Sequence, residues 1–209
     1  RSEMEFEEWE PYYQEILDYF GIIREDDEKA ARILASLIGK DDCILLLSLC
    51  SERIVTVCGN APTLPYETEH IEGSIFAADA AAGVLYKSGI KPDAVFTDLD
   101  GASESFLAMN REGTIMVIHA HGDNIPQLQY WVPLFPGPVV GTTQSQPVPP
   151  LHNFGGFSDG DRAAFAADAL GAERIVFVGF DLDDMNVGHM KRGKLLWARR
   201  LLRLIGYEC

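Results

Sequence analysis

The chain has 209 residues, of which 47% are hydrophobic, and a formal net charge of −15. This length suffices for one domain with a full hydrophobic core, or for one domain with a small appendage. The negative charge argues against nucleic acid as a partner, because a phosphate backbone requires a basic face. The sequence has no run of ~18 apolar residues, so we expect no membrane span. Its acidic first residues do not resemble a signal peptide, and we expect a cytoplasmic protein.

The four cysteines do not form a zinc-binding or disulfide pattern. No two of them are spaced as C-x-x-C, and three lie in or beside apolar stretches. We therefore interpret them as buried or incidental thiols in a reducing compartment. They are Cys43, Cys50, Cys58 and Cys209.

The first part of the chain is predicted to be helical. Residues 6–20 and 26–38 both carry apolar side chains at spacings of three and four, which is typical of amphipathic helices. The apolar run 43–50 is compatible with a buried helix or a strand, and we favour a helix. We expect residues 1–52 to form an N-terminal helical cap and residues 53–209 to form a separate catalytic α/β domain.

Strands and helices alternate through the rest of the chain. Apolar runs that predict strands are followed by longer amphipathic segments that predict helices. This alternation is typical of a parallel, doubly wound sheet, so we predict a three-layer, Rossmann-like α/β fold. The expected strands are 54–58, 75–78, 94–96, 114–118, 139–140 and 174–178. The expected helices are the segment ending at 87, 103–112, 125–131, 158–170 and 190–205.

Polar residues stand at the ends of most predicted strands. Asp98 and Asp100 follow the strand 94–96, and residues two apart on an extended chain point to the same side. Two neighbouring carboxylates repel each other unless a cation lies between them, and their oxygens suit Mg²⁺. An acidic turn that caps the next helix would explain these two residues taken alone. The parallel sheet favours a shared ligand site, because it brings all strand ends to one edge. The polar residues at these ends are Asn60, Asp79, Asp98, His119, Thr142 and Asp181.

Two local motifs suggest other enzyme classes. Residues 96–101 resemble the D-x-D-G-T motif of haloacid-dehalogenase-type phosphatases, although Ala102 replaces the threonine and the motif lies mid-chain. The residues His119, His121 and Asp123 resemble the H-x-H-x-D-H motif of zinc-dependent metallo-β-lactamases, in which two imidazoles bind one metal. Here Asn124 replaces the last histidine.

A resemblance that covers the chain from about residue 55 to its end is more specific. Eight short blocks occur in family order: 59–64, 78–81, 92–101, 119–124, 141–144, 153–162, 179–181 and 191–197. Together they resemble the archaeal 6-hydroxymethyl-7,8-dihydropterin pyrophosphokinases, a family related in fold to thiamine pyrophosphokinases. The resemblance implies transfer of diphosphate from ATP to the pterin hydroxymethyl group, with release of AMP. The product would enter tetrahydromethanopterin or folate synthesis.

The resemblance also implies roles for individual residues. Asp98, Asp100 and Asp123 would bind Mg²⁺, and His119 and His121 are candidates for a general base. The free N–H groups at the start of the helix near Asp159 and Gly160 could receive phosphate oxygens. The expected substrate-binding and ATP-binding residues are Gly59, Asn60, Asp79, Asn124, Thr142, Gln144, Asp159, Gly160, Arg162, Asp181 and Lys194.

Some questions stay open from the sequence. Thiamine or another acceptor could replace the pterin, and a nucleotide-binding module without turnover is a further alternative. The expected partners are ATP and a pterin, with no nucleic acid and no membrane, and a homodimer is left open.

Overall fold

The computed structural model describes residues 4–208 and contains one six-stranded sheet in which all neighbouring strands run parallel. The strand order is β5-β4-β3-β2-β1-β6, so the chain steps across the sheet from β1 to β5 and then returns to place β6 beside β1. This order confirms the predicted doubly wound α/β fold. The strands are β1 (Ile54–Cys58), β2 (Ser74–Ala78), β3 (Ala94–Thr97), β4 (Ile115–Ala120), β5 (Val139–Thr143) and β6 (Arg174–Val178).

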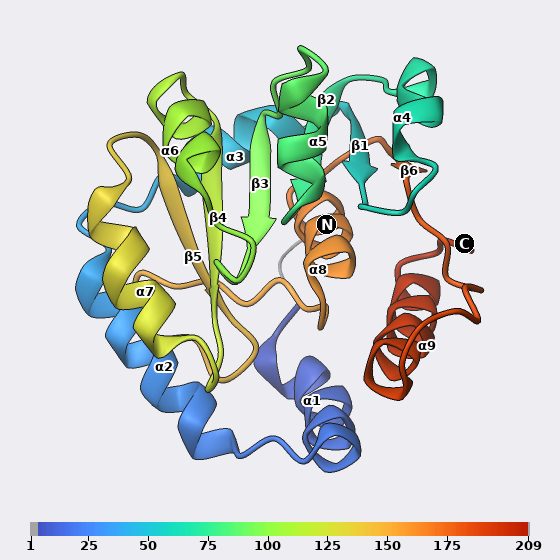
Figure 1. Cartoon of the computed structure of the whole chain (residues 1–209). Coiled ribbons are helices and arrows are strands. Elements are labelled where there is room, and N and C mark those ends of the chain that lie inside the picture. Colours follow the sequence, from blue (N-terminus) through green and yellow to red (C-terminus); the bar gives the residue numbers. More distant parts are fainter. Residues whose placement is uncertain (1–3, 209) are drawn as a thin grey trace.

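Helices cover both faces of this sheet (Figure 1). The longer helices are α1 (Phe6–Phe20), α2 (Arg24–Leu37), α3 (Cys43–Cys50), α6 (Glu104–Arg111), α8 (Asp159–Ala169) and α9 (His189–Leu204). The shorter ones are α4 (Leu64–Glu67), α5 (Ala81–Lys87), α7 (Ile125–Trp131) and the 3₁₀ helices η1 (Thr68–His70) and η2 (Val132–Leu134).

The two faces have separate hydrophobic cores. One core joins the sheet to side chains of α1, α3, α8 and α9, with Phe76 and Phe96 on the strand side. The other core joins the opposite face to α2, α4, α5, α6 and α7, with Val95 and Ile118 on the strand side. Successive residues of a strand point to opposite faces, so neighbours such as Val95 and Phe96 enter different cores. The result is the predicted three-layer arrangement.

The N-terminal helices take part in both cores. Trp9 and Tyr13 of α1 are buried with the α8 side of the sheet, whereas Ala30 and Leu34 of α2 are buried with the α7 side. Figure 1 shows α1 beyond the edge toward which the arrowheads of β1 and β3 point. The 52/53 domain boundary stays a prediction, but α1 and α2 extend the sheet's own cores, and α1 lies beyond the carboxyl ends of the strands.

Local sequence signals explain most element ends. Gly21 terminates α1 in the left-handed conformation, with φ of 65°. A capping box joins Ser158 and Asp161 at the start of α8. The run 43–50 is helical, as predicted. Strand β5 is longer than its predicted two residues because its polar end, which includes Thr142, pairs with β4. Helix α4 and the two 3₁₀ helices were not predicted, since such short turns lack a periodic signal.

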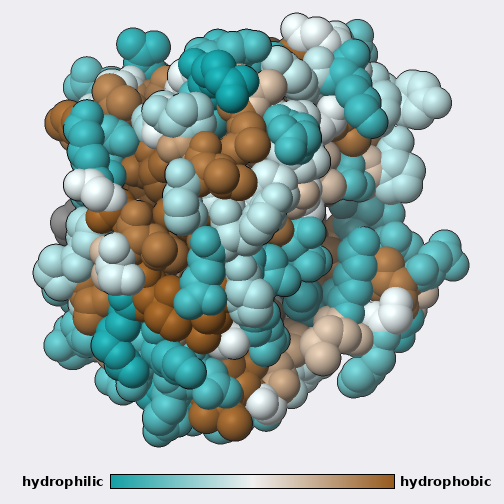
Figure 2. All heavy atoms as spheres, turned by 60° about the vertical axis from the view of Figure 1, so that its left-hand side comes forward, coloured by the Kyte–Doolittle hydropathy of each residue, from teal (hydrophilic) through white to brown (hydrophobic). Residues whose placement is uncertain are grey.

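One face of the molecule carries an apolar surface region. Figure 2, in which the side carrying α2 and α7 is turned forward, shows hydrophobic side chains gathered over a continuous area. Tyr130, Leu134 and Ile44 are among the large hydrophobic residues that are exposed. Within the described residues, none of the helices combines the length and apolar character required to cross a bilayer. Cys209 lies outside the described residues.

Candidate active site

The polar strand ends lie in sequence along one edge of the sheet. The strand order places Gln144 after β5 and His119 at the end of β4. Along the same edge, Asp98 follows β3, Asp79 follows β2 and Gly59 follows β1. Asp181 follows β6 at the far end of this edge. The edge can therefore be described from the β5 end, through an acidic centre, to the β1–β6 junction.

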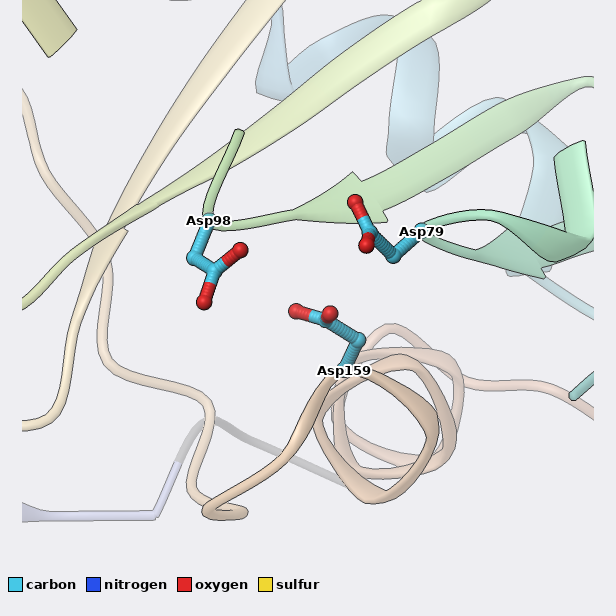
Figure 3. A group of neighbouring side chains, drawn as sticks. All are labelled: Asp79, Asp98 and Asp159. Atoms are coloured by element: carbon cyan, nitrogen blue, oxygen red, sulfur yellow. The ribbon is translucent and has the colours of Figure 1, made fainter. Parts of the chain in front are cut away.

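Three aspartates form the acidic centre. Oxygen atoms of Asp79, Asp98 and Asp159 all lie within 4.8 Å of one another. Figure 3 shows the three carboxylates pointing toward a common space, two from strand ends and the third from the start of α8. Helix α8 packs against β1, β2 and β3, which brings its first residue to the ends of β2 and β3.

Backbone geometry presents Asp79 and Asp98 to this centre. Asp79 has φ of 45° and Leu99 has φ of 71°, a region that residues other than glycine adopt infrequently. The Thr97 hydroxyl donates to Asp79 Oδ1 at 2.7 Å and accepts the Leu99 N–H at 2.8 Å. A side chain at Gly101 would place its Cβ 2.5 Å from Asp79 Oδ2, so the turn can close around Asp79 only because Gly101 has none. Such strained turns are frequent at functional sites.

His121 holds the Asp98 carboxylate in place. Its Nε2 lies 3.2 Å from Asp98 Oδ2, and its Nδ1 accepts the Asp123 backbone N–H at 3.3 Å. This second contact requires the ring proton on Nε2, so His121 donates to Asp98. Burial alone would raise the pKa of Asp98, but the hydrogen bonds from His121 and from the Asp100 N–H, with the nearby Arg162 charge, lower it to about 2. Asp98 is therefore ionised at neutral pH.

Asp159 lies in a different electrostatic environment. Burial raises the pKa of its carboxyl to about 7; Arg162 opposes this shift, and the Asp98 and Asp79 charges add to it. Burial also raises the pKa of Asp79, against the hydrogen bond from Thr97. Arg162 Nη2 lies 2.5 Å from Asp159 Oδ1, and Nη1 donates to the Phe157 carbonyl. The three carboxylates thus lie close together while Arg162 pairs with only one of them, and a bound cation would relieve their repulsion.

The loop after β4 is fixed by Asn124, which is 3% exposed. Its Nδ2 donates to the backbone carbonyls of Asp98 and His119 at 2.9 and 2.7 Å. Its Oδ1 accepts the His121 N–H at 2.9 Å. Asn124 was predicted to bind substrate, but these backbone contacts use its amide, so its observed contribution is to hold the β3 and β4 ends together.

His119 and Gln144 lie on the β5 side of the acidic centre and are each 2% exposed. His119 Nδ1 lies 3.0 Å from Thr142 Oγ1, and Gln144 Nε2 donates to Asp27 Oδ2 at 2.7 Å. Burial lowers the pKa of His119 well below its ordinary value, so the ring is neutral. The neutral ring makes no hydrogen bond through Nε2, and its lowered pKa makes His119 a weaker base than an ordinary histidine.

A cavity of about 380 Å³ opens beside the acidic centre. Its walls come from the α1–α2 connection, the ends of β3, β4 and β5, the start of α8 and one face of α9. Predicted site residues that line it are Asp98, His119, His121, Asp123, Gln144, Asp159, Arg162 and Lys194. The N-terminal helices therefore form part of the cavity wall.

Other predicted residues lie elsewhere. Asp100 and Asp123 are exposed and are not members of the acidic group, although Asp123 lines the cavity. Asn60 and Asp181 are exposed at the β1–β6 junction. There, Gly59 and Gly160 accommodate Phe180, since a Cβ at either position would lie within 3 Å of its ring; the ring fills the space between β1 and α8.

Sequence reasoning missed Asp27 and Tyr13. Asp27 is fully buried in the first turn of α2 and accepts hydrogen bonds from the Tyr13 hydroxyl, Gln144 Nε2 and the Gly122 N–H. The pattern of α2 offered one signal, an acidic residue on the apolar face that carries Ala30 and Leu34. The metal prediction also omitted Asp79 and Asp159 from the Asp98 group, because only the tertiary fold brings α8 to the ends of β2 and β3.

A parallel sheet with acidic strand ends and an adjoining cavity defines a doubly wound α/β enzyme that acts on small molecules. Residues 34–187 match the family described as 6-hydroxymethylpterin diphosphokinase MptE-like. The chain belongs to this family, as the resemblance of its motifs predicted. This family assignment takes the place of the phosphatase and zinc-hydrolase alternatives.

Three similar proteins are each named 6-hydroxymethyl-7,8-dihydropterin pyrophosphokinase. The protein of Methanothermobacter thermautotrophicus is 37% identical, over 95% of this chain and 94% of its own length. That of Pyrococcus furiosus is 38% identical, over 95% and 93%. That of Methanocaldococcus jannaschii is 30% identical, over 97% and 96%.

The fold also occurs in a larger protein. The structure of the MAf glycosyltransferase from Magnetospirillum magneticum AMB-1 superimposes with a TM-score of 0.56 at 17% identity. The match covers 88% of this chain and 35% of that protein. At this identity the similarity concerns the fold alone.

Proposed function

We propose that this protein transfers diphosphate from ATP to the hydroxymethyl group of 6-hydroxymethyl-7,8-dihydropterin and releases AMP. In this reaction the hydroxymethyl oxygen forms a bond to the β-phosphorus. The bond between that phosphorus and the α–β bridging oxygen breaks, and the hydroxyl proton is released. The observation that carries the proposal is the acidic centre beside the cavity, in a chain 30–38% identical to three proteins named for this reaction.

The acidic centre suits a magnesium ion. All three side chains offer hard carboxylate oxygens, and an octahedral ion with bonds of about 2.1 Å would draw its ligands to within roughly 3–4 Å of one another. The observed limit of 4.8 Å requires only a small closure. We propose Asp79, Asp98 and Asp159 as the ligands, in place of Asp100 and Asp123, which were predicted from sequence and lie exposed outside this group. Bound Mg²⁺ would neutralise phosphate charge in the transition state.

The chain's own residues would position the reactants. Arg162 fixes Asp159 and contributes positive charge, and the exposed Lys194 lines the cavity where it can approach a phosphate. His121 orients Asp98 by its hydrogen bond. Phosphoryl transfer depends mainly on positioning and charge neutralisation, so this arrangement needs no strong base.

The order of strand ends suggests how the two substrates share the edge. The cavity lies at the β3, β4 and β5 ends, which is the space we assign to the pterin. The β1–β6 junction is the topological switch point, the usual location for a nucleotide in a doubly wound sheet. We assign the nucleoside to that side, near Asn60 and Asp181, so that the triphosphate extends over Asp79.

The direct test is the nucleotide product. The protein is incubated with ATP, Mg²⁺ and the reduced hydroxymethylpterin, and nucleotides are separated by chromatography. We expect AMP in equal amount with a pterin diphosphate, which would supply tetrahydromethanopterin or folate synthesis. Formation of ADP would contradict attack at the β-phosphorus, and turnover of thiamine in place of the pterin would contradict the acceptor.

A further inference from the structure

Two buried polar atoms at the β5 end of the cavity have no hydrogen-bond partner. They are His119 Nε2 and Gln144 Oε1, and both side chains are 2% exposed and belong to the cavity wall. Buried polar atoms in folded proteins are nearly always paired. Two such atoms in one cavity wall therefore indicate that a ligand supplies their partners.

We assign His119 Nε2 as an acceptor from the hydrogen bonds around it. Thr142 Oγ1 donates to the Ile118 carbonyl at 3.4 Å, which leaves its lone pairs for His119 Nδ1 at 3.0 Å. Nδ1 then carries the ring proton. The other nitrogen, Nε2, then has a free lone pair.

Gln144 Oε1 is an acceptor whose orientation is fixed from behind. The Gln144 amide nitrogen must face Asp27 Oδ2, at 2.7 Å, because the opposite orientation would place two oxygens against each other. Asp27 is in turn held by Tyr13 and Gly122, and the Gln144 carbonyl accepts the Trp9 indole N–H at 2.8 Å. Helices α1 and α2 thus fix the orientation of the Gln144 amide in the cavity wall.

We propose that these two acceptors recognise the pyrimidine edge of the pterin ring, through its ring N–H and its 2-amino group. This inference rests on the proposed function and names the residues that select the acceptor. A pterin presents adjacent N–H donors on that edge, which match a wall of acceptors. Adenine presents one amino donor beside a ring nitrogen that is an acceptor. One of the two acceptors, His119 Nε2 or Gln144 Oε1, would then face the lone pair of that ring nitrogen. The acceptor wall therefore selects the pterin and not the nucleotide.

The adjoining wall suits a flat ring. Phe20 at the end of α1 and Phe157 before α8 are stacked, with ring centroids 4.7 Å apart, and both line the cavity. Both are half-buried, so they offer apolar surface beside the polar edge. A flat heterocycle gains from such aromatic contact, while the two acceptors fix which edge enters.

Equilibrium binding tests this assignment without turnover. The fluorescence of 6-hydroxymethylpterin reports its binding, and 6-hydroxymethyllumazine, in which an oxygen replaces the 2-amino group, serves as the comparison ligand. We expect the wild-type protein to bind the pterin at least about tenfold more tightly than the lumazine. The lumazine complex would lack one hydrogen bond and would leave one buried acceptor unpaired. Equal affinity for the two ligands in the wild-type protein would overturn the proposal, whatever any variant does.

A pair of matched substitutions locates the effect. Gln144→Leu should weaken pterin binding about tenfold or more and remove the preference over lumazine, while the affinity for a non-hydrolysable ATP analogue with Mg²⁺ stays unchanged. Gln127→Leu is the control, because Gln127 Oε1 in α7 is also buried without a partner but lies outside the cavity. Equal losses in both variants, or a loss of ATP-analogue affinity in Gln144→Leu alone, would contradict the assignment.

The outcome is separable from that of the proposed function. AMP formation with no discrimination between pterin and lumazine would overturn the recognition wall and leave the reaction intact. Absence of both pterin binding and AMP formation would overturn the proposed function and this inference together.

Discussion

Asn124 and Asn110 offer a controlled test of whether the β4 loop organises the site. Each amide makes three hydrogen bonds to backbone groups. Asn124 joins the β3 and β4 ends beside the acidic centre, as described above. Asn110, fully buried at the end of α6, donates to the Thr114 and Pro138 carbonyls at 2.9 Å each and accepts the Gly137 N–H at 2.7 Å. These contacts lie where β4 and β5 begin, at the opposite edge of the sheet.

The expected loss of stability is the same for both alanine variants. A hydrogen bond contributes about 1 kcal/mol net, so Asn124→Ala and Asn110→Ala should each lower the free energy of unfolding by about 3 kcal/mol. For a chain of this length, about 1 kcal/mol corresponds to roughly 2–4 °C in Tm. Each variant should therefore melt about 6–12 °C below the wild-type protein.

The expected effects on activity differ. Without Asn124, the His121 N–H and the Asp98 carbonyl lose their common anchor, and His121 no longer orients the Asp98 carboxylate. Small misplacements of reacting groups can lower a rate about a hundredfold, so kcat should fall at least about tenfold with little change in KM. Asn110→Ala should keep the wild-type kcat. The measurement is AMP formation at a temperature at which both variants are fully folded by circular dichroism.

Two results would refute this reasoning. If both variants lost kcat equally, the loss in Asn124→Ala would reflect general loosening of the sheet. If Asn124→Ala kept full activity at the same reduced stability, Asn124 would have no role in positioning Asp98.

Three further outcomes are expected. Gly101→Ala should displace Asp79 and lower kcat at least about tenfold. Gly39→Ala is the control and should keep the wild-type kcat, because nothing lies within 4 Å of the added Cβ. Equal rates in the two variants would contradict the role of the turn. Burial raises the pKa of the Cys50 and Cys58 thiols to about 12, so neither should react with a disulfide reagent at pH 8 until the protein unfolds. Labelling of either thiol in the native protein would contradict this expectation. These folded-state pKa values lie above the ordinary thiol value of 9.0, so their contribution to stability is present below pH 9 and is lost as pH rises from 9 toward 12. Urea titrations at several pH values would detect this loss. The oligomeric state is left open by the sequence, and light scattering after gel filtration would decide it.

The sequence predicted the layers of the fold because their signals are local. Apolar runs of two to five residues identified the strands, and the amphipathic pattern identified α1 and α2. The parallel order then implied that polar strand ends share an edge, and the structure places Asp79, Asp98 and His119 along it. Periodicity could not reveal α4 or the 3₁₀ helices, which are too short to carry it.

The composition of the acidic centre depended on tertiary structure. Asp98 and Asp100 looked equivalent at strand spacing, but the turn at Leu99 has φ of 71° and breaks the extended geometry that would align them. Asp100 therefore points to solvent, and Asp159 arrives from a helix about 60 residues later. Asp27 was hidden for the same reason: its partners Tyr13, Gly122 and Gln144 come from three other segments.

Binding of Mn²⁺, followed by electron paramagnetic resonance, tests most directly whether Asp79, Asp98 and Asp159 hold the cation. Free Mn²⁺ would be measured in the presence of a non-hydrolysable ATP analogue for the wild-type protein, Asp98→Asn and Asp123→Asn. The account predicts that Asp98→Asn loses Mn²⁺ affinity at least about tenfold and that Asp123→Asn, altered at an exposed position outside the group, stays close to wild type. Loss of affinity in Asp123→Asn with full affinity in Asp98→Asn would contradict it.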